Sequence, residues 1–253
     1  MHISIGGTVC RCASKCRIIA ACFFDPWLPM SSPHTLEHYN PPPDTGLSLL
    51  YQDDYLLVVD KPAGLLSVPG RGEARQDCLI QRVQRRVPDA LIVHRLDMGT
   101  SGILLLARGE AMQRTLSMAF AGRQLHKRYE AIVCGQLQPA SGDIHLPLIT
   151  DWPNRPRQIV DHAIGKPSHT GYQVLAYDAE RDVSRVSLTP HTGRTHQLRV
   201  HMQALGHPIL GDGLYATPEG QAAAPRLLLH ACQLGLPHPV SGEWLQLDCP
   251  APF

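Results

Sequence analysis

The chain has 253 residues, of which 43% are hydrophobic and 18% charged, and its formal net charge is +1 at pH 7. This composition is ordinary for a globular enzyme and excludes recognition of a nucleic acid through overall charge. Any surface for a polyanion must therefore be built from basic residues that are grouped locally.

The N-terminal segment, residues 1–46, is predicted to be a flexible extension. Residues 1–29 are interpreted as a mis-called start or a dispensable leader, and the prolines of 30–46 favour an extended arm. The apolar run over 18–24 is shorter than the roughly 20 residues of a membrane span. The spacing C-x-C-x3-C-x5-C lacks the paired C-x-x-C of zinc sites, so no metal is expected there.

The ordered domain is predicted over 47–253 and begins with two strands. The apolar segments LSLLYQ and YLLVVDK flank Asp53-Asp54, which is typical of strands joined by a tight turn. A loop rich in glycine and proline follows. Asp77 is predicted to cap a helix that carries Leu79, Ile80, Val83 and Val87 at helical spacing.

The next stretch, IVHRLDMGTSGILLLAR, places a charged triplet between two apolar runs that we predict to be core strands. An aspartate in such a bend is most often a turn or cap residue. Two features favour a functional Asp97 instead. The segment from Gly99 to Gly102 would let backbone approach a ligand closely, and Arg95 offers a cation to an anionic partner.

The rest of the domain is predicted to mix strands and helices irregularly. Helices are expected over 111–120 and around 198–205, and strands over 129–134, 172–177, 183–189, 226–230 and 244–248. Because strands and helices do not alternate, the fold class is α+β with a mixed, largely antiparallel sheet flanked by helices and loops. The scattered cysteines are expected to be reduced thiols of a cytoplasmic protein: Cys78, Cys134, Cys232 and Cys249.

A second charged stretch, HTGRTHQLRVHMQALGHPILGD, gathers donors around one predicted helix. Its histidines, His191, His196 and His201, are five residues apart, unlike zinc ligands at i and i+4 on a helix, which favours RNA-backbone or structural roles. A cation such as Arg194 is slightly unfavourable at a helix start, where the helix dipole is positive. Arg194 is therefore expected to pair with a carboxylate or a phosphate.

Local basic runs accompany these motifs, although each alone is usually a solvated face. Together they would suit a polyanion lying across one side of the protein. The runs are Arg71 and Arg75; Arg82, Arg85 and Arg86; Arg123, Lys127 and Arg128; and Arg155 and Arg157.

Several motifs occur in an order that resembles the RluA family of RNA pseudouridine synthases: HRLD with TSG, K-x-Y within HKRYEAIVCG, TGRTHQLRVHM and GHPILGD. The resemblance runs from about Tyr51 to the C-terminus. It implies the pseudouridine synthase catalytic fold over 47–253, without the S4 RNA-binding module of other members. GLLSVPGR, PLITDWPNRPRQ and PRLLLHA are similar to members that modify both large-subunit rRNA and tRNA.

The resemblance also implies site residues. Asp97 matches the catalytic aspartate, Tyr129 the tyrosine that packs against the target base, and Arg194 the arginine that pairs with the catalytic carboxylate. The substrate-binding residues that it implies are Arg95, which contacts RNA where the flipped nucleotide departed, and Leu198, which lines the base pocket. His94 and Arg199, which belong to the two charged stretches, are also predicted to bind substrate.

The implied reaction breaks the N1–C1′ bond of uridine and joins C5 to C1′. No redox change occurs, so no cofactor and no metal are expected, and the sequence has no P-loop and no G-x-G-x-x-G. The partners implied are hairpin loops of large-subunit rRNA and of tRNA, including the anticodon stem-loop, where the target must leave the stack. No membrane association is expected, and the default is a monomer.

Two other functions are less consistent with the motifs. An RNA-binding or folding chaperone of the same fold would have no need of a carboxylate that repels phosphate. A glycosidic-bond hydrolase would need a second carboxylate to activate water, and the matching motifs are expected to supply none.

Overall fold

The computed structural model describes residues 39–253. The predictions for the leader, for the N-terminal cysteine cluster and for the first part of the arm lie outside these residues. No helix among them is long and apolar enough to cross a lipid bilayer. The helices are η1 Glu73–Arg75, α1 Leu79–Gln84, α2 Gly109–Ala121, α3 Gln197–Ala204 and α4 Pro218–Ala222.

One large sheet organises the domain. Its strands are β1 Ser48–Gln52, β2 Leu56–Lys61, β3 Ala90–Ile92, β4 Ser101–Arg108, β5 His126–Cys134, β6 Ser141–Ile144, β9 Thr170–Asp178, β10 Val183–Pro190, β11 Leu229–Pro237 and β12 Trp244–Asp248. The order is β1-β2-β4-β11-β5-β10-β9-β6, with β3 beside β4 and β12 beside β11. Only β4 and β11 pair in parallel in this described sheet, so the predicted α+β, largely antiparallel fold is confirmed.

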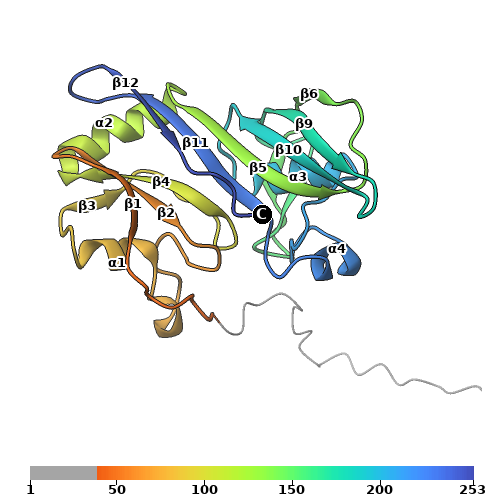
Figure 1. Ribbon diagram of the computed structural model, residues 1–253, viewed down its shortest axis with the longest axis horizontal. Helices are drawn as coiled ribbons and strands as arrows, with labels where there is room; N and C mark the ends of the chain where they lie inside the picture. Colours follow the sequence, from red (N-terminus) through yellow and green to blue (C-terminus); the bar gives the residue numbers. More distant parts are fainter. Residues whose placement is uncertain (1–38) are drawn as a thin grey trace, which may run out of the picture. The chain divides into compact units, whose positions relative to one another are not determined.

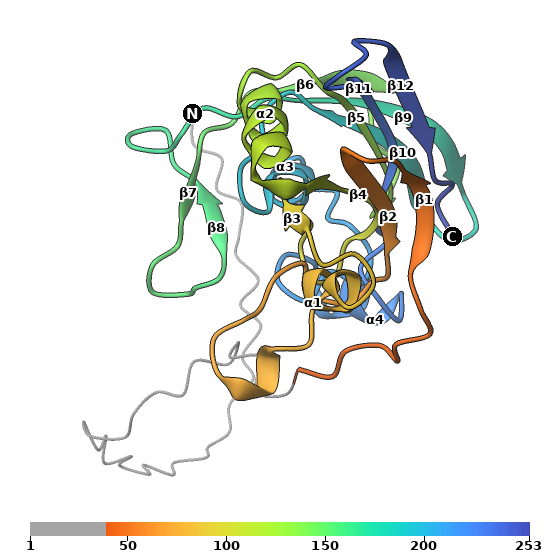
Figure 2. The same ribbon diagram turned by 90° about the vertical axis from the view of Figure 1, so that its left-hand side faces the viewer.

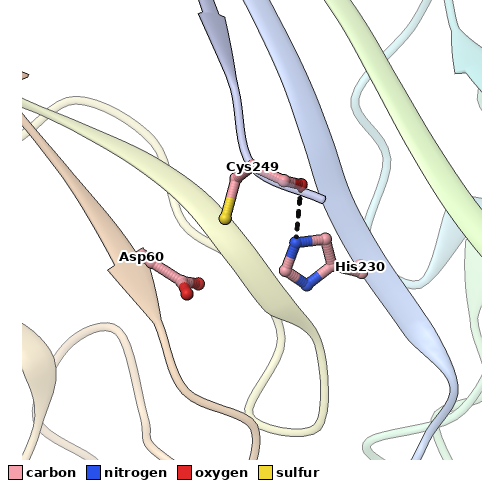
Figure 3. A group of neighbouring side chains, drawn as sticks. All are labelled: Asp60, His230 and Cys249. Atoms are coloured by element: carbon pink, nitrogen blue, oxygen red, sulfur yellow. Dashed lines mark hydrogen bonds between the residues drawn. The ribbon is translucent and has the colours of Figure 1, made fainter. Parts of the chain in front are cut away.

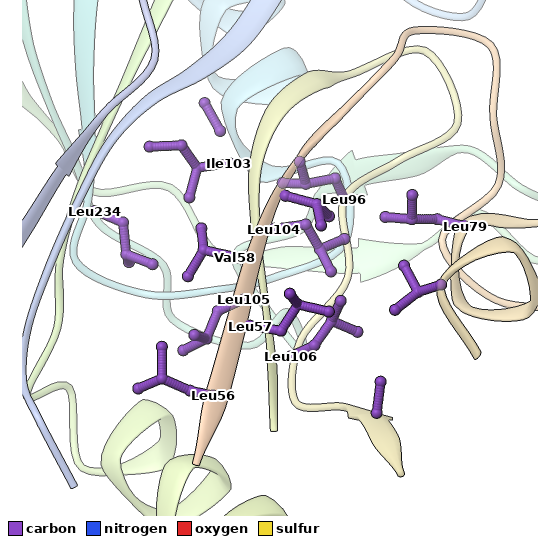
Figure 4. Close-up of a cluster of buried hydrophobic side chains, with 14 of the residues drawn as sticks. Leu56, Leu57, Val58, Leu79, Leu96, Ile103, Leu104, Leu105, Leu106 and Leu234 are labelled. Carbon is purple, nitrogen blue, oxygen red and sulfur yellow. The ribbon is translucent and has the colours of Figure 1, made fainter. Parts of the chain in front are cut away.

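Two hydrophobic clusters fill the two halves of this sheet, which are visible on either side of β11 and β5 in Figure 1. The first packs β2 and β4 against α1 and α2; Figure 4 shows Leu57 of β2 beside Leu104 and Leu106 of β4. The second packs β5, β9 and β10 against α3. Both faces of β4 are covered, which explains its unbroken apolar run.

The helices cover both sides of the layer formed by β2, β3 and β4: Figures 1 and 2 show α2 above this layer and α1 below it. A separate hairpin of β7 Leu148–Thr150 and β8 Gln158–Val160 projects from the large sheet in Figure 2. Because α3 contacts β8 as well as β10, the hairpin and the sheet hold the helix from two directions.

Most of the predicted helices and strands are confirmed, and the differences concern the start of one strand, a few short elements and one helix cap. The strand predicted over 226–230 is β11, which begins at Leu229, and the short β6, β7, β8 and α4 were missed. The capping role of Asp77 is wrong. Cys78 occupies the N-cap position without a side-chain cap, while Asp77 accepts two hydrogen bonds from Arg82 at 2.6 and 2.8 Å.

The described part of the N-terminal arm, from residue 39, is tied to the loop before α1. The Tyr39 hydroxyl donates to the Asp77 carbonyl at 2.9 Å and accepts from the Leu66 amide at 3.0 Å. Arg82 donates to the Pro42 carbonyl at 2.7 Å and is only 6% exposed. Arg82 therefore anchors the arm and, contrary to the sequence argument, is not part of a surface for a polyanion.

Gly102 joins the two halves of the sheet. It has φ +106°, and a Cβ built there would lie 2.3 Å from the carbonyl oxygen of Ala231, its parallel neighbour on β11. The close backbone approach expected in this glycine-containing segment therefore serves strand pairing at Gly102, not a ligand.

Candidate active site

A cleft at the seam between the two halves brings most of the predicted site residues together. The cavity is about 160 Å³, and its lining includes Arg95, Asp97, Lys127, Tyr129, Thr192, Arg194, His196, Leu198 and Arg199. These residues come from the bend before β4, from β5, and from the loop and first turns of α3. Segments about 100 residues apart therefore converge on one carboxylate.

The bend that carries Asp97 is held on both sides. The Ser67 hydroxyl donates to the Leu96 carbonyl at 2.7 Å and accepts from the Leu96 amide at 3.1 Å. The Met98 carbonyl accepts from the Gly64 amide at 2.8 Å and from the ammonium of the buried Lys61 at 3.2 Å. A group placed by packed, hydrogen-bonded backbone keeps its position more accurately than one on a free loop.

The arginine that pairs with Asp97 is Arg199. Its Nη1 donates to Asp97 Oδ2 at 3.2 Å, while its Nε and Nη2 make a fork with both oxygens of Asp212 at 2.7 Å each. The Asp212 side chain is 0% exposed, whereas that of Asp97 is 25% exposed. Asp212 therefore orients the guanidinium, and Asp97 remains the carboxylate that faces the cleft.

Arg194 does not make the pairing with Asp97 that the resemblance implied. It is exposed, and its Nε donates to the Pro167 carbonyl at 3.2 Å. The side chain lies at the rim of the same cavity. Arg194 precedes the helix and therefore points elsewhere, whereas Arg199 lies inside α3 on the side that faces the bend.

His196 was not singled out as a site residue, although it belongs to the same cleft. It has the left-handed φ of 53° at the N-cap of α3, which turns its ring inward. Its Nε2 lies 3.8 Å from Asp97 Oδ2, and its Nδ1 is 2.7 Å from the Tyr215 hydroxyl. Burial lowers the pKa of His196 against a weaker opposite effect of Asp97, which favours a neutral ring.

Tyr129 and Leu198 form the apolar wall of the cleft. Tyr129 lies on β5 between Ala231 of β11 and Leu188 of β10. Burial raises the pKa of Tyr129 and the nearby Asp97 charge raises it further, so the phenol stays protonated. Leu198 is 7% exposed and lines the same cavity.

His94 was predicted to bind substrate, but it is not among the residues that line this cavity. Its ring stacks on Phe120 at 4.5 Å between centroids, and its Nε2 accepts from the Leu105 amide at 3.0 Å. Burial lowers the pKa of His94 to about 3. His94 therefore packs behind the bend as a neutral ring, which accepts a hydrogen bond from the backbone of β4.

A second carboxylate does lie in the matching motifs, contrary to the sequence argument. Asp212, the last residue of GHPILGD, is fully buried. Both of its oxygens are occupied by Arg199, and one also accepts from the amides of Leu214 and Tyr215. It therefore cannot activate a water in the cleft, and the disfavoured hydrolase gains no support.

Two groups in the described part of the chain contain enough close donor atoms for a metal ion. The first is Asp60, His230 and Cys249, shown in Figure 3. His230 Nε2 lies 3.0 Å from the Cys249 carbonyl and its Nδ1 lies 2.8 Å from the Ser101 hydroxyl, so both ring nitrogens are engaged. Burial raises the pKa of the Cys249 thiol to about 12. The side chains of this group are therefore engaged with one another and with neighbouring residues, and they link β2 to β11. The second is Asp143, His145 and His169.

Comparisons with known proteins point to one family. Residues 55–204 match the model of the family described as RNA pseudouridylate synthase. The chain is 53% identical over 218 residues to the dual-specificity RNA pseudouridine synthase RluA of Escherichia coli K12, covering 86% of this chain and 99% of that protein. It is 47% identical over 215 residues to the protein of the same name from Pasteurella multocida, covering 85% and 98%.

Solved structures show the same fold. Human RNA Pseudouridylate Synthase Domain Containing 1 is similar with a TM-score of 0.70 and 32% identity, covering 85% of this chain and 87% of that one. Human RNA Pseudouridylate Synthase Domain Containing 4 has a TM-score of 0.66 and 28% identity, covering 81% and 88%.

Proposed function

This chain belongs to the RluA family of RNA pseudouridine synthases and is therefore an isomerase of uridine in RNA, and we propose that the cleft around Asp97 is where it acts. The observation that carries this proposal is the convergence of Asp97, Tyr129 and Arg199 from three distant segments on one cavity. A carboxylate, its cation and an apolar wall are the groups that exchange of a glycosidic bond would use.

In this proposal Asp97 acts at C1′ of the target nucleotide. The carboxylate either attacks C1′ or assists removal of a ribose proton, so that N1 is released and C5 can take its place. Arg199 aims the carboxylate and balances its charge, and Asp212 holds Arg199 in place. The reaction needs no change of oxidation state, so none of these steps requires a cofactor.

The flipped nucleotide would be bound by Tyr129 and Leu198, and Arg95 would fill the space that it leaves. Extruding a base costs a few kcal/mol, which stacking on an aromatic ring and filling of the vacated space can offset. Tyr129 and Leu198 supply the apolar surface inside the cavity. Arg95 is exposed at its mouth and makes no hydrogen bond or ion pair within residues 39–253, so it is free to enter the RNA.

The substrates that we propose are hairpin loops of large-subunit rRNA and of tRNA, including the anticodon stem-loop. The support is the similarity to relatives named dual-specificity synthases, which extends over 99% of the Escherichia coli protein. We also propose that residues 47–253 are the catalytic domain and that 1–46 are an extension to it. The protein is further proposed to work as a cytoplasmic monomer. The free Cys78, Cys134, Cys232 and Cys249 suit a reducing compartment.

Release of tritium from RNA labelled at C5 of uridine tests the proposal, because forming the C5–C1′ bond expels the C5 hydrogen. The wild-type protein should release tritium from both a tRNA and a large-subunit rRNA fragment, and Asp97→Asn should release none. Asp54→Asn is the matched control, because the Asp54 side chain is 93% exposed and does not line the cleft.

Three outcomes would contradict the proposal. Release by Asp97→Asn at the wild-type rate would remove the carboxylate from the reaction. Free uracil in place of pseudouridine would point to hydrolysis. Tight RNA binding without release from either RNA would leave the binding or chaperone function, or a different RNA target.

A further inference from the structure

Three histidines lie in a row across the ends of three neighbouring strands, away from the cleft carboxylate. Ile144 of β6 pairs with Thr170 of β9, so His145, just after β6, faces His169, just before β9. The His191 amide donates to the His169 carbonyl at 3.0 Å and extends the row to the end of β10. The side chains therefore stand one strand spacing apart on the same face of the sheet.

The rings of this row are stacked. The centroid distance is 4.1 Å between His145 and His169 and again between His169 and His191, with 19° between the planes in each case. Asp143, two residues before His145, completes the group: its Oδ1 lies 2.6 Å from His169 Nε2. One carboxylate oxygen and two imidazole nitrogens, from Asp143, His145 and His169, all lie within 4.8 Å of one another.

These separations allow a metal site once the exposed His145 ring turns out of its stack on His169, because stacked rings direct their nitrogen lone pairs along parallel planes. Bonds of about 2.0–2.2 Å at a tetrahedral angle place the ligand atoms about 3.4 Å apart. The contact of 2.6 Å would have to open by less than about 1 Å, and the other separations, none of them above 4.8 Å, would have to close by no more than about 1.4 Å. His145 and Asp143 are exposed, so their side chains can make these adjustments without disturbing packed groups.

We infer that Asp143, His145 and His169 form a binding site for a divalent transition-metal ion of the zinc class. Two imidazoles and one carboxylate are a donor set that zinc takes, and nickel and copper bind similar sets. His191 packs on the outer face of the His169 ring and limits its rotation. Solvent would complete the coordination, because the site faces outward.

The contrast with Asp60, His230 and Cys249 supports this choice. There both imidazole nitrogens already have partners, so binding of an ion would break hydrogen bonds within the core. Here His145 makes no hydrogen bond within residues 39–253, and His169 is bonded through Nε2 only to the carboxylate that would share the ion. An ion would replace one interaction and create three.

The site lies behind the loop that enters α3. The His169 amide donates to Thr192 Oγ1 at 2.9 Å, and the His169 carbonyl accepts from Gln197 Nε2 at 2.9 Å. An ion bound to His169 would therefore stiffen the backbone on which Thr192 and the start of the helix rest, and it would fasten β6 to β9. This inference does not depend on the proposed role of the cleft.

Metal titration of the full chain tests it. The chelator-treated wild type is titrated with Zn²⁺ by calorimetry beside Asp143→Asn, His145→Gln and His169→Gln. Each of these variants should bind one equivalent less than the wild type. His162→Gln is the matched control, because His162 is exposed on the same segment and does not belong to the group.

Co²⁺ spectra separate this site from any cysteine site elsewhere in the chain. The three variants should lose cobalt d–d absorption without losing a sulfur-to-cobalt charge-transfer band. Anomalous diffraction from a zinc-soaked crystal should place the ion about 2.0–2.2 Å from the three donor atoms. Equal stoichiometry in wild type and in all three variants, or a zinc-saturated crystal without an ion at this group, would overturn the inference.

Discussion

Arg199 divides its guanidinium between two carboxylates, and this division is the main electrostatic feature of the cleft. Two of its nitrogens are engaged by the buried Asp212, and the third reaches Asp97 at 3.2 Å. A lysine could pair with one of these carboxylates, but it could not donate a two-nitrogen fork to Asp212 and also reach Asp97 with a third nitrogen. Arg199 therefore acts by positioning the carboxylate proposed to do the chemistry.

We predict that Arg199→Lys lowers kcat for tritium release by about 10- to 100-fold, which is about 1.4–2.7 kcal/mol of transition-state stabilisation. KM should change less, because the ammonium preserves the charge in the cleft. Single-turnover kinetics on a tRNA substrate measure the effect.

Arg194→Lys is the matched control, since Arg194 lies on the rim and donates only to a backbone carbonyl through its side chain within the described residues. It should stay within a few-fold of the wild-type kcat. A larger loss of kcat in Arg194→Lys than in Arg199→Lys would favour pairing of Asp97 with Arg194, as the resemblance implied, over its pairing with Arg199.

His94 makes the stability of the fold depend on pH. Its pKa is about 3 in the folded protein, against an ordinary value of about 6.5. Between these values the unfolded chain binds the proton and the folded chain does not, so the free energy of unfolding falls as the pH drops below about 6.5. We predict that His94→Gln makes this fall shallower.

Urea unfolding at about pH 7 and about pH 4.5, on either side of the ordinary histidine value, measures the difference. His126→Gln is a suitable control, because His126 is exposed. The same pH dependence in His94→Gln and in the wild type would show that another group, such as the buried His201, is responsible.

At the scale of elements, the parallel contact of β4 with β11 joins the two halves of the sheet. Gly102 makes this contact possible, because a Cβ there would lie 2.3 Å from backbone of β11. We predict that Gly102→Ala destabilises the protein by well over about 1 kcal/mol, through both strain and displacement of β11. The midpoint of urea unfolding measures it.

Gly72→Ala provides the comparison for backbone strain alone. Gly72 has φ +87°, close to the +106° of Gly102, but nothing lies within 4 Å of its virtual Cβ. It should cost clearly less than Gly102→Ala. Equal losses in the two variants would mean that strand contact adds nothing to the requirement for glycine.

At the scale of the whole molecule, the proposed affinity for RNA must arise from a few cations in a nearly neutral protein. The chain has 23 lysines and arginines and 22 acidic residues. Arg95, Lys127 and Arg194 line the cleft, whereas Arg82 is buried in an ion pair. We therefore expect a shallow salt dependence of binding that reflects a small number of phosphate contacts.

If Arg194 contacts a phosphate, Arg194→Gln should reduce the slope of log K against log salt by about 0.7–0.9. The variant should also weaken the binding of all RNAs by a similar factor. Filter binding over a range of KCl concentrations measures the slope. Arg114→Gln, on the exposed face of α2, should leave it unchanged. An unchanged slope in Arg194→Gln would exclude this phosphate contact.

The sequence by itself determined the parts that depend on local periodicity and on ordered motifs. Alternating and unbroken apolar runs predicted β2, β4, β5, β9 and β10, and their irregular order with helices predicted the fold class. The HRLD motif located Asp97 at a bend between two strands. Tyr129 and Leu198 were also placed on elements that do reach the cleft.

Only the tertiary structure decided which side chains are partners. Arg194 and Arg199 share one motif, yet only Arg199 reaches Asp97, because side-chain direction depends on where α3 begins. His94, beside the same motif, turns into the core. The row of His145 and His169 has no signature along the chain, because strand register, not linear spacing, sets the contact. Local sequence encodes periodicity and turns, whereas pairing across about 100 residues follows from closure of the sheet.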